Sequence, residues 1–264
     1  MEIIGYLASL LIGISLGMIG GGGSILTIPV LVYLFHIHPT LATGYSLFIV
    51  GCSSLAGAYK NYRKGSIHFK AAFYFGIPSI LTVVLIRKWL IPIIPEQLWM
   101  MGSISITRSL LTMLLFAVVM IVASIHMIQK EAVQKPAGSL PSIQFSKALL
   151  KGVQVGILTG LLGAGGGFII IPVLIFSFQL DMKKAIGSSL LIIAMNSLFG
   201  FLGDLFHQQF DWSLLLPITA IAITGTFIGR KMGETIPGEK LKKGFGWFVL
   251  VMGIYIIIHE LFVR

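Results

Sequence analysis

The stretch Gly20-Gly21-Gly22-Gly23, followed by Ile28-Pro29-Val30-Leu31, decides the fold because the chain contains it twice. The second copy reads Gly163-Ala164-Gly165-Gly166-Gly167 and leads into Ile171-Pro172-Val173-Leu174. Residues 13–47 align with residues 156–190 at a constant offset of 143, and fifteen of these thirty-five positions are identical. Such self-similarity predicts two halves of related structure.

The composition indicates a membrane protein. Hydrophobic residues make up 56% of the chain and charged residues only 11%, whereas soluble domains contain about 25% charged residues. Apolar runs cover residues 3–35, 41–59, 69–86, 109–128, 148–178, 185–206, 214–228 and 245–262. Most have the roughly 20 residues that a spanning helix needs. The sequence therefore predicts an all-α, multi-pass integral membrane protein, which we expect in the cell membrane.

A polar stretch divides the chain. Residues 129–146 contain Pro136, Gly138 and Pro141 and form the longest polar segment, as expected of a connection between packed units. We predict a first membrane repeat over residues 1–128, a cytoplasmic linker over residues 129–147 and a second membrane repeat over residues 148–264.

Loop charges predict that the two halves have opposite orientations. The net charge is +10, but the basic residues lie in short loops between apolar runs, which argues against nucleic-acid binding and is typical of cytoplasmic loops. The loop after the second run carries Lys60, Arg63, Lys64 and Lys70, whereas its counterpart in the second half carries Asp204 and Asp211. These two loops should lie on opposite sides of the membrane, as in an inverted repeat.

The first apolar run of each half is too long for one crossing. A continuous helix over residues 3–35 would be about 50 Å long at 1.5 Å per residue, against a hydrocarbon core of about 30 Å. We therefore expect each half to contain one glycine-broken, re-entrant helical hairpin plus three transmembrane helices, with about eight hydrophobic segments in all. This arrangement places Arg87, Lys88 and Arg108 in outside loops, against the usual charge bias. The alternative is that the glycine segments cross once and the halves are parallel.

The duplicated glycine breaks are the candidate binding site. Broken backbone at membrane depth is tolerated only inside protein or beside a water-filled cavity, and glycine lets a ligand approach the backbone closely. The helix that follows each break presents free amides and a positive dipole end, which attract anions. The candidate residues are Gly20, Gly21, Gly22, Gly23, Ser24 and Thr27 in the first half and Gly163, Gly165, Gly166 and Gly167 in the second. The competing interpretation is close helix packing through small residues.

Small polar residues on the next run extend this site. Ser46, Ser53, Ser54 and Asn61 correspond at the same offset to Ser189, Asn196, Ser197 and Asp204. Hydroxyl and amide groups can donate to an anion without the penalty of burying a charge. We select Ser46, Ser53, Ser189 and Asn196 as candidate ligands and prefer Asn196, whose amide has two donors. Hydrogen bonds between helices are the alternative role for each.

These motifs resemble the TauE/SafE sulfite exporter family. The resemblance rests on the two glycine turns with Ile-Pro-Val-Leu, on residues 42–47 (Ala-Thr-Gly-Tyr-Ser-Leu) and on residues 185–190 (Ala-Ile-Gly-Ser-Ser-Leu). It covers nearly the whole chain. It implies a transporter of small anions such as sulfite, sulfonates and related organosulfur compounds.

Enzymatic chemistry is not indicated. The sequence has one cysteine, Cys52, and lacks HExxH, Walker and Gly-x-Ser-x-Gly motifs, so we predict no catalytic residues, no metal and no cofactor. We expect no acidic residue well inside a crossing, which leaves His126, Asp204 or the substrate itself to carry a proton if transport is proton-coupled. The expected function is alternating-access transport of a small, sulfur-containing anion held at half-helix N-termini. The alternatives are an anion channel, or a non-transporting membrane subunit that docks a partner. The sequence does not indicate an oligomeric state.

Overall fold

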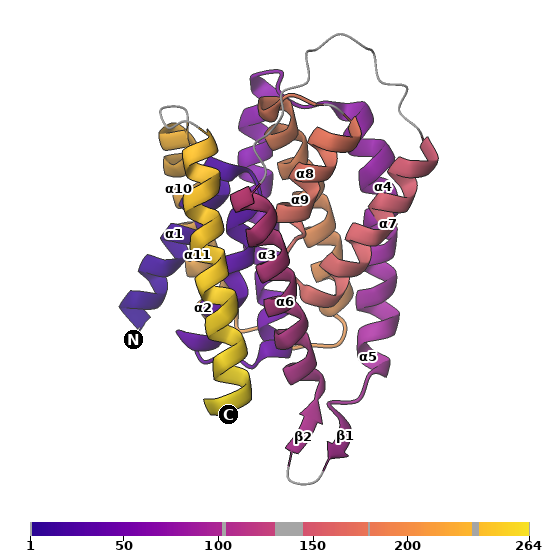
Figure 1. Ribbon diagram of the computed structural model, residues 1–264, viewed down its shortest axis with the longest axis vertical. Coiled ribbons are helices and arrows are strands. Elements are labelled where there is room, and N and C mark those ends of the chain that lie inside the picture. Colours follow the sequence, from indigo (N-terminus) through magenta and orange to yellow (C-terminus); the bar gives the residue numbers. More distant parts are fainter. Residues whose placement is uncertain (1, 102–103, 130–144, 179, 234–237, 264) are drawn as a thin grey trace.

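The protein is an elongated bundle of helices (Figure 1). The computed structural model describes residues 2–101, 104–129, 145–178, 180–233 and 238–263. Five of the described helical segments are long and apolar enough to cross a membrane: Pro39–Arg63, Phe69–Ile93, Arg108–Ile125, Lys183–Asp204 and Trp212–Gly233. The chain is therefore a multi-pass helical membrane protein, and the part that the structure describes contains, besides helices, one small β-hairpin.

The first half contains α1 (Glu2–Ile19), η1 (Gly22–Leu26), α2 (Thr27–Tyr33), α3 (Pro39–Arg63), α4 (Phe69–Leu85), η2 (Ile86–Leu90), α5 (Ile91–Ile93) and α6 (Arg108–Gln129). A two-stranded antiparallel hairpin, β1 (Gln97–Met101) and β2 (Ile104–Thr107), lies between α5 and α6. The second half contains α7 (Phe145–Leu162), α8 (Gly167–Phe178), α9 (Met182–Asp204), α10 (Trp212–Gly233), α11 (Gly238–Ile258) and η3 (His259–Val263). Most of the predicted linker, residues 130–144, lies outside the described residues.

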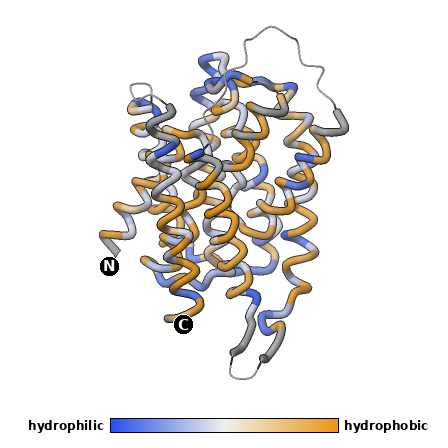
Figure 2. The backbone as a smooth tube through the Cα atoms, in the orientation of Figure 1, coloured by the Kyte–Doolittle hydropathy of each residue, from blue (hydrophilic) through white to orange (hydrophobic). Residues whose placement is uncertain are grey.

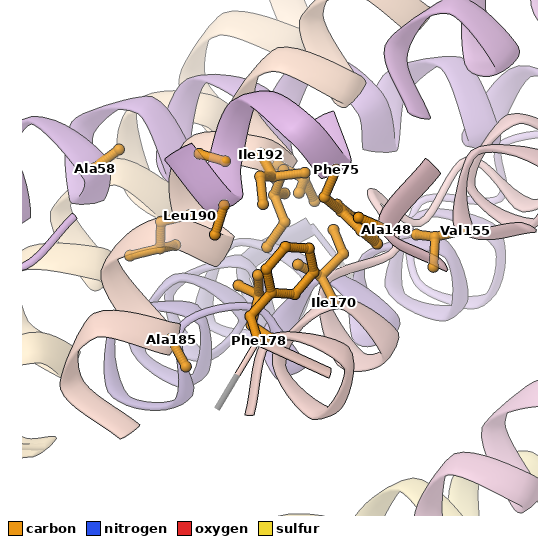
Figure 3. Packing of buried hydrophobic residues seen from close by; sticks show 14 of the residues in the cluster. Ala58, Phe75, Ala148, Val155, Ile170, Phe178, Ala185, Leu190 and Ile192 are labelled. Atoms are coloured by element: carbon orange, nitrogen blue, oxygen red, sulfur yellow. The ribbon is translucent and has the colours of Figure 1, made fainter. Parts of the chain in front are cut away.

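Each glycine-broken segment folds back on itself. In the first half, the Tyr6 ring near the start of α1 meets the Phe35 ring just after α2, with centroids 5.6 Å apart. In the second half, Gly152 in the first half of α7 and Phe178 at the end of α8 both contact Phe75 of α4. Figure 3 shows Phe75 and Phe178 together with Ala148 and Ile170 in this core. The ends of α2 and α8 thus return to the ends from which α1 and α7 began.

Glycine stripes join each hairpin to a helix of the other half. On α1, a Cβ atom at Gly13 or Gly17 would meet the backbone of Ala222 or Thr226 on α10. On α7, a Cβ atom at Gly156 would lie 2.6 Å from the Ser79 carbonyl oxygen of α4. In both pairs, residues later in one helix contact residues later in the other, so the two helices run parallel. Small residues spaced four apart allow this close approach between apolar helices.

The two central helices, α3 and α9, run antiparallel. Gly44 near the start of α3 faces Asp204 at the end of α9, Gly51 faces Leu198, and Gly57 faces Leu190. The side chains between them are largely buried, including Tyr45, Leu47 and Phe201.

The outer helices present apolar surface. Leu7 and Leu11 of α1 and Leu81 and Leu85 of α4 are about 60% exposed. Figure 2 shows hydrophobic residues along most helices. Hydrophilic residues gather towards the upper end and near the base of the β-hairpin. This distribution suits a protein whose sides face lipid.

Two local features differ from the sequence-based expectation. The β1–β2 hairpin was not predicted. Arg87, expected in an outside loop, instead lies in the π-helical turn η2 that continues α4, and it is 1% exposed. Arg108 donates to the carbonyl oxygens of Ile91 and Ile94 and pairs with Glu96, so it fastens the loop after α5.

Candidate functional site

The two glycine turns meet in the interior of the protein. A Cβ atom at Gly21 would lie 2.9 Å from the Cα atom of Gly167 and 2.8 Å from Cδ1 of Ile193. No side chain fits there without displacing backbone. The tips of two hairpins that are separated by about half of the chain are therefore in direct contact.

The second turn depends on glycine conformation. Gly163, Gly165 and Gly166 have φ angles of 70°, 67° and 68°, and Gly20 of the first turn has a φ of 74°. Residues that carry a side chain rarely adopt this left-handed backbone conformation. The chain then starts α8 at Gly167 in the second half, whereas the first half continues as the 3₁₀ helix η1 from Gly22 and becomes α-helical only at Thr27. The two predicted half-helix N-termini are thus not equivalent in detail.

Two of the predicted polar residues, Ser189 and Ser24, form hydrogen bonds with the backbone of the first glycine turn. The Ser189 hydroxyl group lies 2.8 Å from the carbonyl oxygen of Gly20 and 2.9 Å from that of Ile186, so it links α9 to the first turn. The Ser24 hydroxyl donates to the Gly21 carbonyl oxygen at 2.8 Å. Both residues therefore support the backbone of the first turn.

Other polar side chains are buried with hydrogen-bonding capacity unused. Among the described residues, the following buried atoms have no hydrogen-bond partner: Thr27 Oγ1, Ser46 Oγ, Ser53 Oγ, Ser54 Oγ, Thr159 Oγ1, Ser197 Oγ and the Asn196 Oδ1 atom. The Asn196 amide nitrogen donates to the Ser79 hydroxyl at 2.7 Å. A buried polar group without a partner costs about 1 to 3 kcal/mol, so a group of them calls for an explanation.

Two of these hydroxyl groups lie directly beside the second turn. A Cβ atom at Gly165 would be 2.9 Å from Ser197 Oγ. A Cβ atom at Gly166 would overlap Thr159 Oγ1 of α7. Glycine backbone and free hydroxyl groups thus come together immediately before α8. Thr159, which has no hydroxyl counterpart at Leu16, was missed by the sequence analysis.

A buried ion pair, which the sequence did not predict, joins the two halves. Arg87 Nη1 lies 2.8 Å from Asp204 Oδ2, and the two side chains are 1% and 2% exposed. The same nitrogen donates to Thr43 Oγ1 at 3.0 Å, and Thr43 in turn donates to the Thr40 carbonyl oxygen. Asp204 is the last residue of α9, as expected of an acidic residue near a helix end, but nothing in the sequence indicated that its side chain is buried. The repeat places an arginine at the same point of each half, Arg87 and Arg230, but does not indicate the acidic partner of Arg87.

Two further titratable side chains, His259 and Asp211, have local structural contacts. His259 lies against the rings of Tyr33 and Tyr255, and the described residues contain no cluster of three or more potential metal ligands. In the loop before α10, hydrogen bonds from the Ser213 side chain and amide lower the pKa of the Asp211 carboxyl group. The side chain of His126 lies outside the described residues.

Both a protein family and individual membrane proteins are similar to this chain. The family described as "Sulfite exporter TauE/SafE" matches residues 5–256. A "Probable membrane transporter protein" of Xylella fastidiosa strain Temecula1 is 30% identical over 254 residues, covering 94% of this chain and 91% of that protein. The "Probable membrane transporter protein YdhB" of Bacillus subtilis is 28% identical over 251 residues, covering 95% and 98%. No solved structure matches the chain.

The family match covers nearly the whole sequence, both glycine turns and all five long apolar helices. The relatives are similar over almost their entire length and are named as membrane transporters. The chain therefore belongs to the TauE/SafE sulfite exporter family of membrane proteins.

Proposed function

We propose that this protein is a secondary transporter that carries a small anion across the cell membrane. Family membership favours a sulfur-containing anion such as sulfite or an organosulfonate. The names of the relatives support a transporter and do not specify a substrate.

The observation that carries this proposal is the meeting of two glycine turns beside free, buried hydroxyl groups. Gly21 contacts Gly167, and Ser197 and Thr159 lie against Gly165 and Gly166. Hydroxyl groups can donate to anionic oxygens, and α8 directs the positive end of its dipole towards this point. In this proposal the anion binds between the turns, within reach of these hydroxyl groups.

The packing of the helices supports an inverted repeat. The equivalent helices α3 and α9 lie antiparallel, and each hairpin packs along a helix of the other half: α1 on α10 and α7 on α4. Two halves of opposite orientation around one central site form an arrangement that suits alternating access. Movement of a hairpin against its partner would then expose the site to one side at a time.

Proton coupling forms part of the proposal. Among the sequence candidates, Asp204 is the carboxylate whose side chain the structure places inside the protein. Buried carboxylates in membrane transporters commonly take part in proton transfer. Transport by this protein should therefore respond to a pH gradient across the membrane.

Ligand-induced stabilisation tests the proposed substrate class. A ligand that binds the folded state raises the melting temperature of the purified protein. We expect sulfite or a sulfonate to stabilise the detergent-purified protein more than acetate or chloride at equal concentration. A preference for acetate would contradict the sulfur assignment, and the absence of any shift would contradict the proposed anion site.

A further inference from the structure

We propose that Arg87 binds the anionic group of the substrate through the Nε and Nη2 edge of its guanidinium group. This inference rests on the proposed transport function and adds a binding residue that the glycine and hydroxyl site lacks. Asp204 and Thr43 would hold the opposite side of the guanidinium group in place.

The donors of Arg87 are used on one side only. Nη1 contacts both Asp204 Oδ2 and Thr43 Oγ1, at 2.8 and 3.0 Å. Nε and Nη2 are buried and have no hydrogen-bond partner among the described residues. Together these two nitrogens form a single edge with parallel N–H groups, the geometry that binds two oxygens of one anion.

A purely structural ion pair does not account for this arrangement. Burying an arginine is favourable only if the geometry is good and the remaining N–H groups are satisfied. Here Asp204 neutralises the charge, but three of the five N–H groups, on Nε and Nη2, stay unused. A substrate that supplies two oxygens would satisfy this edge.

The free edge of Arg87 lies beside the second glycine turn. A Cβ atom at Gly163 would be 2.5 Å from Nη2 and 2.5 Å from Cβ of Thr43. The turn therefore packs against the proposed anion-binding edge, and an anion that binds there must displace it. Substrate binding at Arg87 would thus favour movement of the α7–α8 hairpin, which is the movement that alternating access requires.

The two halves differ at this position. Arg87 corresponds to Arg230 at the offset of 143, whereas Asp204 corresponds to Asn61. The Asn61 amide donates to the Gly57 carbonyl oxygen within its own helix. The proposed anion contact lies on the Arg87 side of the repeat, where the structure describes a buried carboxylate, Asp204, against the guanidinium group.

The geometry favours oxyanions over spherical anions. Sulfite, sulfonates and carboxylates present two oxygens at a spacing that matches the guanidinium edge. Chloride can contact both N–H groups but offers a single acceptor. Discrimination between methanesulfonate and chloride is therefore the property that should depend on Arg87.

The test compares Arg87→Lys with the charge-neutral double variant Arg87→Gln/Asp204→Asn. Lysine keeps the ion pair but lacks the two-nitrogen edge, and the double variant removes both charges together so that neither is left unpaired. Thermal-shift titrations with sulfite and methanesulfonate should show roughly tenfold or greater loss of affinity in both variants. Arg108→Lys is the control, because the described hydrogen bonds of the Arg108 side chain go to the carbonyl oxygens of Ile91 and Ile94 and to Glu96. It should lower the melting temperature without changing anion affinity.

The outcomes separate this inference from the proposed function. Saturable sulfite binding and uptake by the wild type, with the same affinity in folded Arg87→Lys protein, would overturn the role of Arg87 and leave the transporter intact. Absence of anion binding in the wild type would overturn both. If Arg87→Lys fails to fold, as judged by size-exclusion chromatography, the double variant decides. Wild-type affinity in that variant would equally overturn the inference.

Discussion

At the scale of single residues, the interior of this protein is unusual because several buried hydroxyl groups have no hydrogen-bond partner within the part of the chain that the structure describes. Apolar cores normally satisfy buried hydroxyl groups or exclude them. Ser54 of α3 and Ser197 of α9 are equivalent in the repeat, both are fully buried, and neither hydroxyl has a partner among the described residues. Such positions lower stability, and we propose that these hydroxyl groups bind the transported anion.

Replacing these hydroxyl groups should separate function from stability. We expect Ser54→Ala and Ser197→Ala to keep or raise the melting temperature, because each removes an unsatisfied buried group. Anion uptake should fall roughly fivefold in each, the value of about one hydrogen bond. Uptake into proteoliposomes and thermal melting of the same preparations provide the two measurements.

Ser9→Ala is the matched control for these substitutions. Ser9 is equally buried, but its hydroxyl donates to the Gly5 carbonyl oxygen within α1. Uptake by this variant should equal that of the wild type. Wild-type uptake by Ser54→Ala and Ser197→Ala would show that the free hydroxyl groups have no part in transport.

The buried ion pair should behave differently from the hydroxyl groups. Asp204→Ala leaves the Arg87 guanidinium buried without its counter-ion, which should reduce the free energy of unfolding by about 3 to 5 kcal/mol. Arg87→Met/Asp204→Ala should recover most of this loss, because no charge is then buried. Thermal melting of the three proteins provides the measurement. Equal melting temperatures for the single and double variants would argue against a direct interaction.

At the scale of helices and turns, glycine has two separate roles. Gly163 and Gly165 occupy left-handed positions in a turn, whereas Gly17 and Gly229 let α1 and α10 approach each other. The sequence predicted broken hairpins because the repeat, the segment length and the loop charges agreed. It could not assign the two roles to individual glycines, because both require the same absence of a side chain.

Alanine substitutions distinguish packing glycines from replaceable ones. A Cβ atom at Gly229 would overlap the Ile14 carbonyl group of α1, so Gly229→Ala should destabilise the protein by about 1 to 3 kcal/mol. A Cβ atom at Gly244 in α11 would have no atom within 4 Å, so Gly244→Ala should be neutral or stabilising by up to about 1 kcal/mol. Equal melting temperatures for the two variants would contradict the described α1–α10 packing.

The elements that the sequence missed have local explanations. The β1–β2 hairpin flanks Gly102-Ser103 in the sequence, a dipeptide typical of tight hairpin turns, but the surrounding apolar runs favoured helices. Arg87 was assigned to a loop because charge normally ends a membrane helix. Only the approach of Asp204 from the other half makes its burial tolerable, and a contact between residues 117 positions apart leaves no trace in local periodicity.

At the scale of the whole molecule, the proposed transport mechanism requires two halves with opposite orientation. The antiparallel packing of α3 and α9 fits this arrangement. So does the packing of each hairpin on a helix of the other half, α1 on α10 and α7 on α4. In the proposed mechanism, two related conformations are reached by exchanging the roles of the halves. The sequence predicts such symmetry from the repeat and the loop charges, but it gives no indication that Arg87 and Asp204 form a buried pair.

Single cysteines can test the orientation in the membrane. In a Cys52→Ala background, we expect His36→Cys, after the first hairpin, to react with a membrane-impermeant thiol reagent applied to intact cells. Asp181→Cys, after the second hairpin, should react only once the membrane is permeabilised, because the positive-inside bias places the basic loops in the cytoplasm. Labelling of both cysteines from the same side would contradict the inverted repeat.

The most direct test of the central claim is counterflow of isotopically labelled sulfite in proteoliposomes that contain the wild-type protein. An alternating-access carrier with one anion site predicts saturable uptake that accelerates when the vesicles are preloaded with unlabelled sulfite. Uptake that rises linearly with concentration and ignores the internal anion would indicate a channel. No uptake above that of protein-free vesicles would contradict transport of sulfite.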